Sequence, residues 1–139
     1  MTEIDRNGLE VLAREECLRL LERATVGRIA ITSGALPMIL PINYRLDGDR
    51  ILFRTGRGSK LEAATHNAVV AFEVDDFDPL YHSGWSVVVT GVASEVVPRD
   101  GDPVAGTTPR WARGTDDRFV AISIDRLTGR RLDDVAPTV

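Results

Sequence analysis

The segment Phe53-Arg54-Thr55-Gly56-Arg57-Gly58-Ser59-Lys60 carries residue types that hold a phosphate. It leaves a predicted strand, turns on two glycines and enters a predicted helix, where free backbone N–H groups favour an anion. Three of its side chains are cationic and two are hydroxyls: Arg54, Arg57 and Lys60, and Thr55 and Ser59. Such groups form charge-assisted hydrogen bonds to a phosphate dianion. The segment therefore predicts a phosphate-binding loop.

Two known phosphate loops do not fit this segment. A Walker loop requires Gly-Lys-Ser/Thr, whereas the order here is Gly58-Ser59-Lys60, and Leu61 stands where a Rossmann fingerprint needs a third small residue. A purely structural interpretation also exists, because Ser59-Lys60-Leu61-Glu62 has the form of a capping box with Ser59 at the N-cap and Glu62 at N3. The basic side chains would then simply be solvated. Spacing alone leaves both interpretations open.

The common catalytic constellations are missing from the sequence. Cys17 lies on the apolar face of a predicted helix, and His66 and His82 lack the spacing of a metal-binding pair. There is no Cys-x-x-Cys and no Gly-x-Ser-x-Gly. We therefore assign no catalytic residue and no metal site, and an enzyme of this kind would take its reactivity from a cofactor.

The elements that must position the loop are mostly strands. Helical spacing predicts helices over 13–24 and 59–66, and β-branched or alternating patterns predict strands over 26–32, 36–46, 50–55, 68–74, 85–97 and 119–124. Asp47-Gly48 predicts a tight antiparallel hairpin, and Gly91 predicts a bend or bulge. Segment 98–118 is rich in Gly, Pro and Asp and is expected to be functional or mobile, and 128–131 belongs to a polar tail. The sum is a mainly β fold, a six-stranded antiparallel barrel with short flanking helices, in a single domain over 1–139.

The composition of the chain disfavours nucleic-acid-binding and membrane-spanning proteins. The chain has 139 residues and 43% apolar residues, and its net charge of −4 argues against a nucleic-acid footprint over the whole surface. An RNA-binding barrel is also disfavoured, because only four Phe, two Tyr and two Trp are scattered through the chain. No apolar run reaches the length of a membrane helix. The single cysteine fits a reducing cytoplasm.

Taken together, several pieces of the chain resemble the pyridoxamine-5′-phosphate-oxidase-like flavin split-barrel family, and in particular its small members related to nitroimidazole reductases. The matching pieces run from Glu16 to Arg131: Glu16-Cys17-Leu18, Val26-Gly27-Arg28-Ile29-Ala30, Pro41-Ile42-Asn43-Tyr44, Phe53-Arg54-Thr55 with Gly58-Ser59-Lys60, Ala71-Phe72-Glu73-Val74-Asp75, Gly84-Trp85-Ser86-Val87-Val88-Val89-Thr90-Gly91 and Thr128-Gly129-Arg130-Arg131. Their order and spacing carry the resemblance.

The resemblance implies a homodimer with two FMN molecules in grooves between the barrels. It implies a set of cofactor contacts: the phosphate on Arg54, Thr55, Ser59 and Lys60, the isoalloxazine ring along Pro41, Ile42, Asn43 and Tyr44, and the groove lined by Trp85 and Ser86. Trp111 would cover the partner's flavin or pack on its own barrel. Tyr44 and Trp85 would alternatively be core aromatics, and Asn43 would alternatively stabilise a bulge after Pro41.

The family resemblance favours an FMN-dependent oxidoreductase that passes a hydride between flavin N5 and a small molecule. Vitamin B6 oxidation is disfavoured, because typical pyridoxamine-phosphate oxidases have a more basic substrate site and a longer C-terminal region. Two alternatives stay open: a deazaflavin-dependent reductase of the same fold, and a non-catalytic flavin-binding module.

Overall fold

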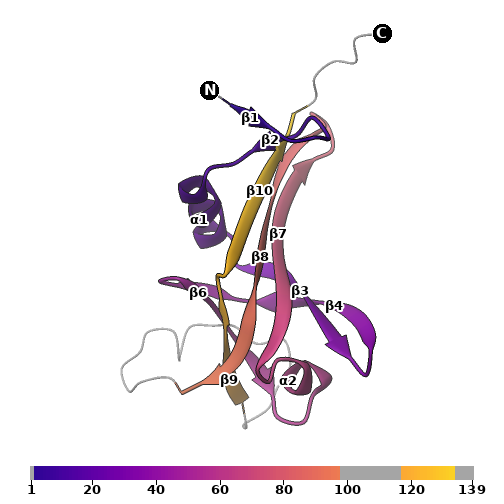
Figure 1. Ribbon diagram of the computed structural model, residues 1–139, viewed down its shortest axis with the longest axis vertical. Helices are drawn as coiled ribbons and strands as arrows, with labels where there is room; N and C mark the ends of the chain where they lie inside the picture. Colours follow the sequence, from indigo (N-terminus) through magenta and orange to yellow (C-terminus); the bar gives the residue numbers. More distant parts are fainter. Residues whose placement is uncertain (1, 98–116, 134–139) are drawn as a thin grey trace.

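The computed structural model describes residues 2–97 and 117–133 and contains one ten-stranded sheet and two helices (Figure 1). The helices are α1 (Arg14–Arg23) and α2 (Lys60–Ala64). The strands are β1 (Glu3–Ile4), β2 (Glu10–Val11), β3 (Val26–Ser33), β4 (Leu36–Asn43), β5 (Arg45–Asp47), β6 (Arg50–Gly56), β7 (Ala68–Asp78), β8 (Ser83–Val96), β9 (Asp117–Ser123) and β10 (Arg126–Leu132). The mainly β, antiparallel split-barrel fold predicted from the sequence is confirmed, but the described residues form ten strands where six were predicted.

The sheet is antiparallel and branches at its longest strand, β8. The main order is β1-β2-β10-β8-β7-β3-β4, while β9 pairs with the other end of β8 and β6 joins β9 to β5. Gly91 lies where β8 changes partner, and an added Cβ there would stand 1.6 Å from the carbonyl oxygen of Ser123 at the end of β9. Gly91 therefore marks a close approach of two backbones, as its place in a strand predicted.

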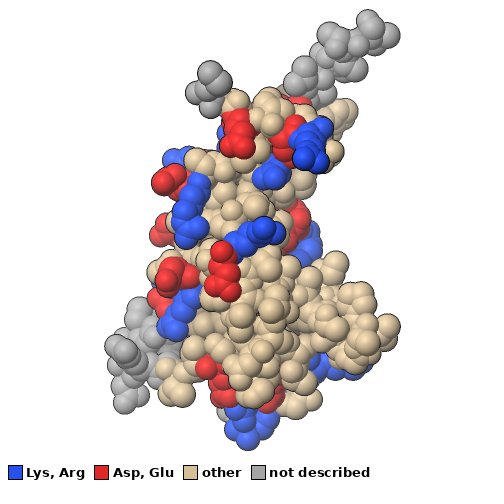
Figure 2. Space-filling view, viewed as in Figure 1, with Lys and Arg blue, Asp and Glu red and all other residues tan. Residues whose placement is uncertain are grey.

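The molecule has little charge over β4 and the neighbouring end of β3, and Figure 2 shows this uncharged area, whereas Arg28 lies nearer the start of β3. Registered pairs lie on the same face of an antiparallel sheet, so the pair Ala30–Ile39 and the pair Val69–Val92 face outward together. Ile39 and Val69 are 70% and 72% exposed. The molecule thus presents an exposed apolar surface on neighbouring strands.

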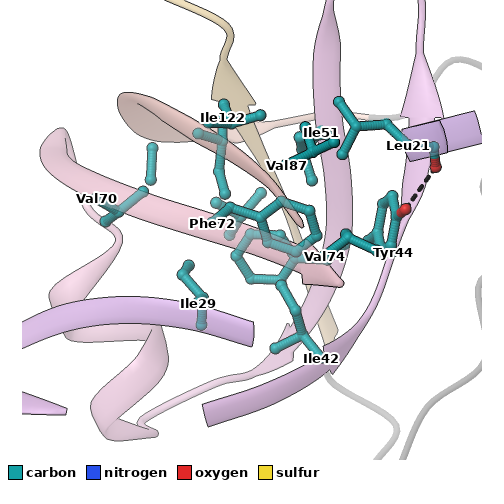
Figure 3. Packing of buried hydrophobic residues seen from close by; sticks show 14 of the residues in the cluster. Leu21, Ile29, Ile42, Tyr44, Ile51, Val70, Phe72, Val74, Val87 and Ile122 are labelled. Atoms are coloured by element: carbon teal, nitrogen blue, oxygen red, sulfur yellow. Dashed lines mark hydrogen bonds between the residues drawn. The ribbon is translucent and has the colours of Figure 1, made fainter. Parts of the chain in front are cut away.

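The opposite face of the sheet forms the core, which Figure 3 shows from close by. Phe53 and Phe72 are fully buried at its centre. Helix α1 covers one end of it with Cys17, Leu20 and Leu21, and the predicted position of Cys17 on the apolar face of this helix is confirmed.

Two predictions about the elements were wrong. The predicted strand 36–46 is divided into β4 and β5, because Tyr44 leaves the ladder and donates its N–H to the Thr25 carbonyl at 3.0 Å. The predicted polar tail at 128–131 belongs to strand β10 instead. Its arginines can lie in the sheet because they form ion pairs, Arg130 with Asp5 at 2.7 Å and Arg131 with Glu16 at 3.3 Å. The short strands β1 and β2 were also not predicted.

The bounds of the predicted elements can be compared with the observed ones only within the described residues. Helix α1 begins and ends within one residue of the predicted bounds, and β9 already begins at Asp117, inside the segment expected to be a loop. Residues 98–116, with Trp111, lie outside the described part of the chain. Within the described part, neither helix has the length and apolar character needed to cross a membrane.

Candidate functional site

The end of β6 and the start of α2 bring four of the predicted site residues together, as a strand–loop–helix connection should. Thr55 is buried at 5% exposure, and its Oγ1 lies 3.0 Å from Ser59 Oγ. Ser59 Oγ in turn donates to the Gly56 carbonyl at 2.8 Å and accepts from the Glu62 N–H at 3.0 Å. Because the Ser59 proton goes to Gly56, Thr55 is the donor in the contact between the two hydroxyls. Segment 54–60 is called the phosphate loop below.

The predicted N-cap is confirmed, with one difference in the capping box. Ser59 accepts from the Glu62 N–H as predicted, but the Glu62 carboxylate accepts from the N–H of Gly58 rather than from that of Ser59. Gly58 has φ +80°, a conformation that suits glycine and turns the amide toward the carboxylate. A loop amide is therefore already bound to an anion.

The cations of the phosphate loop differ in exposure. Arg54 is half-buried, and its guanidinium carbon lies 5.1 Å from the centre of the Phe119 ring, a cation–π distance. Arg57 and Lys60 are exposed at the surface. This arrangement packs one cation against a ring at the base of the loop and leaves two where an anion from solvent can reach them.

A cluster of charges behind the phosphate loop was not predicted. Arg118 on β9 lies opposite Thr55 in the register, and its Nε is 3.1 Å from Glu62 Oε1 while its Nη1 is 2.6 Å from Glu95 Oε2. These three side chains line a cavity of about 380 Å³ together with His66. The capping-box pattern had singled out Glu62, but no sequence signal linked it to residues so far along the chain.

Side chains of the segment Pro41–Tyr44 alternate between the core and the surface. Ile42 and Tyr44 are buried at 5% and 4% exposure, whereas Pro41 is exposed and Asn43 is half-buried. The Tyr44 hydroxyl donates to the Leu21 carbonyl at 2.5 Å, the bond drawn in Figure 3. Its ring lies edge-on to Phe72 with centroids 4.7 Å apart, and burial raises the pKa of Tyr44. Of the two interpretations of Tyr44, the structure shows the core aromatic.

Trp85 and Ser86 occupy β8 and do not lie beside Pro41–Asn43 within one chain. Strands β3 and β7 separate β4 from β8, which at the usual strand spacing is about 14 Å. Trp85 is half-buried and packs against the core cluster, while Ser86 lies opposite Asp75 and Arg130. The predicted ring contacts are thus divided between two parts of the sheet.

Other side chains of reactive types have structural roles. Cys17 is 1% exposed, and burial raises the pKa of its thiol, so it stays protonated in the core. In the parts of the chain that the structure describes, no group of His, Cys, Asp and Glu could hold a metal ion.

On the outer face, Arg28 lies 3.1 Å from Glu73 and 2.7 Å from Asp75. A hydrogen bond that protonated Glu73 donates to Asp75, together with burial, raises the pKa of Glu73.

Comparison with known proteins identifies a family that matches most of this chain. Residues 13–131 match the family described as Pyridoxamine 5'-phosphate oxidase. An uncharacterized protein of Mycobacterium tuberculosis is 39% identical over 129 residues, which is 87% of this chain and 84% of that protein.

Solved structures agree with the match. The FAD binding protein from Mycobacterium smegmatis is 35% identical with a TM-score of 0.75 and covers 88% of this chain and 98% of its own. A FAD-binding protein from Mesorhizobium loti has the same TM-score of 0.75 at 24% identity, covers 90% and 99%, and shows the fold alone. The chain therefore belongs to the pyridoxamine 5'-phosphate oxidase family.

Proposed function

We propose that this protein binds a flavin nucleotide and that the phosphate loop holds the phosphate next to the ribityl chain. One observation carries the proposal: two hydroxyl groups meet at 3.0 Å at the base of a loop that also supplies Arg54, Arg57 and Lys60. The FAD binding protein from Mycobacterium smegmatis, at 35% identity, supports it. FMN and FAD share this phosphate, so the same loop serves either.

The donor set of the phosphate loop fits this group. Phosphate oxygens accept strong hydrogen bonds from guanidinium, ammonium and hydroxyl donors, and these are the side chains that the loop offers. The Gly58 N–H already donates to a carboxylate, which supports the interpretation that this backbone favours an anion. In this structure the Ser59 proton goes to the Gly56 carbonyl and the Thr55 proton to Ser59, so the two hydroxyls would exchange these hydrogen bonds for bonds to the phosphate when it binds.

An oxidoreductase acting on a small molecule is the activity that we propose for the bound state. When bound, a flavin supplies hydride transfer at its N5 atom. The chain would bind and orient it: Pro41 and Asn43 with the backbone of β4 would lie along the ring, and Trp85 and Ser86 would line the groove. Trp111, which lies outside the described residues, stays a candidate for covering the partner's flavin. Tyr44 and Ile42 would act from beneath, by holding the β4 backbone in place.

We also propose a homodimer with the cofactor at the subunit interface. The exposed apolar surface over β3, β4, β7 and β8, of which Figure 2 shows the uncharged part over β3 and β4, supports it. A contiguous exposed patch of this kind is typical of interaction surfaces. A second copy would also explain how β4 and β8, which are about 14 Å apart in one chain, contribute to one groove.

The experiment is an absorption spectrum of the purified protein, followed by mass spectrometry of whatever is released on denaturation. Yellow protein that releases FMN or FAD supports the proposal, and so does colourless protein that takes up either with a shifted spectrum. Protein that binds neither FMN nor FAD would rule out the proposal. Uptake of a deazaflavin only would indicate the other cofactor of this fold, and tight flavin binding without turnover of NAD(P)H would indicate a non-catalytic binding module.

A further inference from the structure

Among the described residues, β4 is the longest strand that has a partner on one side only. It pairs with β3, and its other edge pairs with no described strand (Figure 1). The other strands with a single partner, β1 and β5, have two and three residues, whereas β4 has eight. A free edge of this length offers backbone N–H and C=O groups to a strand of another molecule.

The register of the β3–β4 hairpin determines which backbone groups of β4 point to the free edge. Residues 34–35 form a two-residue turn with φ +56° and +69°, so Ser33 and Leu36 exchange the first hydrogen bonds of the ladder. Hydrogen-bonded and non-hydrogen-bonded pairs then alternate. Even-numbered residues of β4 therefore point their N–H groups toward β3, and odd-numbered residues point theirs to the free edge. The 3.0 Å bond from the Tyr44 N–H to the Thr25 carbonyl follows the same alternation.

Two of the four odd-numbered residues of β4 are prolines, Pro37 and Pro41. Proline has no N–H, so only Ile39 and Asn43 keep a donor at the free edge. A further strand could not form a continuous ladder with this edge. The prolines are also the protection that the strand has, because β4 contains no charged residue and charges are the usual alternative.

We propose that Pro37 and Pro41 prevent a further strand from pairing with β4, so that a second copy of this chain binds the exposed apolar surface and not the sheet edge. The choice of that surface rests on the homodimer proposed above, whereas the blocked edge does not. Side chains of the odd-numbered residues lie on this surface, as the pair Ala30–Ile39 does. An apolar strand with an open edge would allow two modes of association, and the prolines leave one.

The double substitution Pro37→Thr/Pro41→Thr restores both edge donors and keeps the even-numbered N–H groups that bond to β3. Threonine has a high β propensity and adds no charge. The matched control is Pro79→Thr, because Pro79 is also exposed but lies in the turn between β7 and β8, outside the ladder. Any general effect of replacing an exposed proline by threonine therefore appears in the control.

The measurement is size-exclusion chromatography with light scattering at several protein concentrations. We expect Pro79→Thr to show the wild-type mass at each concentration, and the double variant to show at least about twice that mass, because its edge can pair with another copy. Infrared spectra should show the band of intermolecular β-sheet in the double variant alone. A double variant with the wild-type mass, or a control that associates as strongly, would overturn the inference.

If the double variant does not fold in a thermal melt, two single variants test the direction of the donors instead. Ile39→Pro removes an edge donor, whereas Met38→Pro removes a hydrogen bond to β3. Met38→Pro should lower the melting temperature by about 5–10 °C and Ile39→Pro much less. Equal losses would overturn the inference.

The proposed homodimer and the blocked edge fail in different ways. A wild type that stays monomeric removes the proposed dimer, and the comparison of wild type with the double variant still decides whether the prolines block the edge. A dimeric wild type whose mass the double substitution leaves unchanged removes the role of the prolines alone.

Discussion

At the scale of single residues, Lys60 is the only lysine of the chain and begins α2. Lys60→Ala should weaken FMN binding by about 1.5–3 kcal/mol, because a hydrogen bond to a charged group contributes that much. Riboflavin lacks the phosphate and should lose far less. Titration of both ligands measures the difference, with Arg23→Ala, an exposed cation on α1, as the control. Equal losses for FMN and riboflavin would mean that Lys60 does not contact the phosphate.

Tyr44 is a residue whose substitution should affect stability and not binding. Its hydroxyl donates to the Leu21 carbonyl in the last turn of α1, where helix carbonyls lack partners within the helix. Tyr44→Phe should lower the free energy of unfolding by about 1–3 kcal/mol, measured by urea denaturation, since it leaves a buried acceptor without its donor.

Flavin affinity should stay unchanged in Tyr44→Phe. The control is Tyr81→Phe, because Tyr81 is 68% exposed and its hydroxyl can be solvated. A Tyr44→Phe variant of normal stability but weakened flavin affinity would restore the ligand-contact interpretation of this residue.

The sequence predicted local features of the site and missed the contacts between distant segments. Ser59 was identified as an N-cap because the pattern that defines a cap lies within four residues. The ion pair between Arg118 and Glu62 joins residues from β9 and α2, and no spacing rule connects them. Tyr44 stayed ambiguous because an aromatic residue near the end of an apolar segment fits a ring platform as well as a core, and only burial separates the two.

At the scale of elements, alternation of apolar residues predicted the strands that are buried on one side. Strand β3 follows this rule, with Gly27, Ile29 and Ile31 inward and Arg28 outward. Strand β10 does not, because its sequence Arg126–Leu132 is dominated by polar residues whose charges are met by Asp5 and Glu16 from other elements. Tertiary ion pairs of this kind leave no local pattern, so the strand could not be predicted.

Strand β7 carries a carboxylate pair, Glu73 and Asp75, beside Arg28 on β3, and the effect of this pair on stability depends on pH. The pKa of Glu73 is raised above its ordinary value of 4.5, so the folded state holds this proton more tightly than the unfolded state. The contribution of Glu73 to stability therefore falls as pH rises through the raised pKa. Glu73→Gln should raise the melting temperature by about 1–2 °C at pH 7.5, a small effect because the site is partly exposed.

The gain from Glu73→Gln should disappear as the pH falls below 4.5, where the wild-type group is protonated in both states. Glu22→Gln, on the exposed side of α1, should show no such pH dependence. Thermal melts across the pH range measure both. A melting temperature lowered by Glu73→Gln at pH 7.5 would mean that attraction to Arg28 outweighs repulsion from Asp75.

At the scale of the whole molecule, the apolar surface over β3, β4, β7 and β8 should hold two copies together. Ile39 is 70% exposed at its edge, so Ile39→Glu should leave the fold intact and introduce a charge into the interface. Sedimentation velocity should give a dimer for wild type and a monomer for this variant, with weaker flavin-nucleotide binding. Leu80→Glu is the control, since Leu80 is 78% exposed in the turn between β7 and β8. A monomeric wild type at tens of micromolar would contradict the proposed dimer.

The central claim is that the phosphate loop holds the phosphate of a flavin nucleotide. The most direct test compares the dissociation constants of riboflavin, FMN and FAD for the wild-type protein under one set of conditions. We predict that at least one nucleotide binds more than tenfold more tightly than riboflavin, because only the nucleotides carry the group that Arg54, Lys60 and the two hydroxyls would hold. Equal affinity for all three ligands, or no binding of any, would contradict the account.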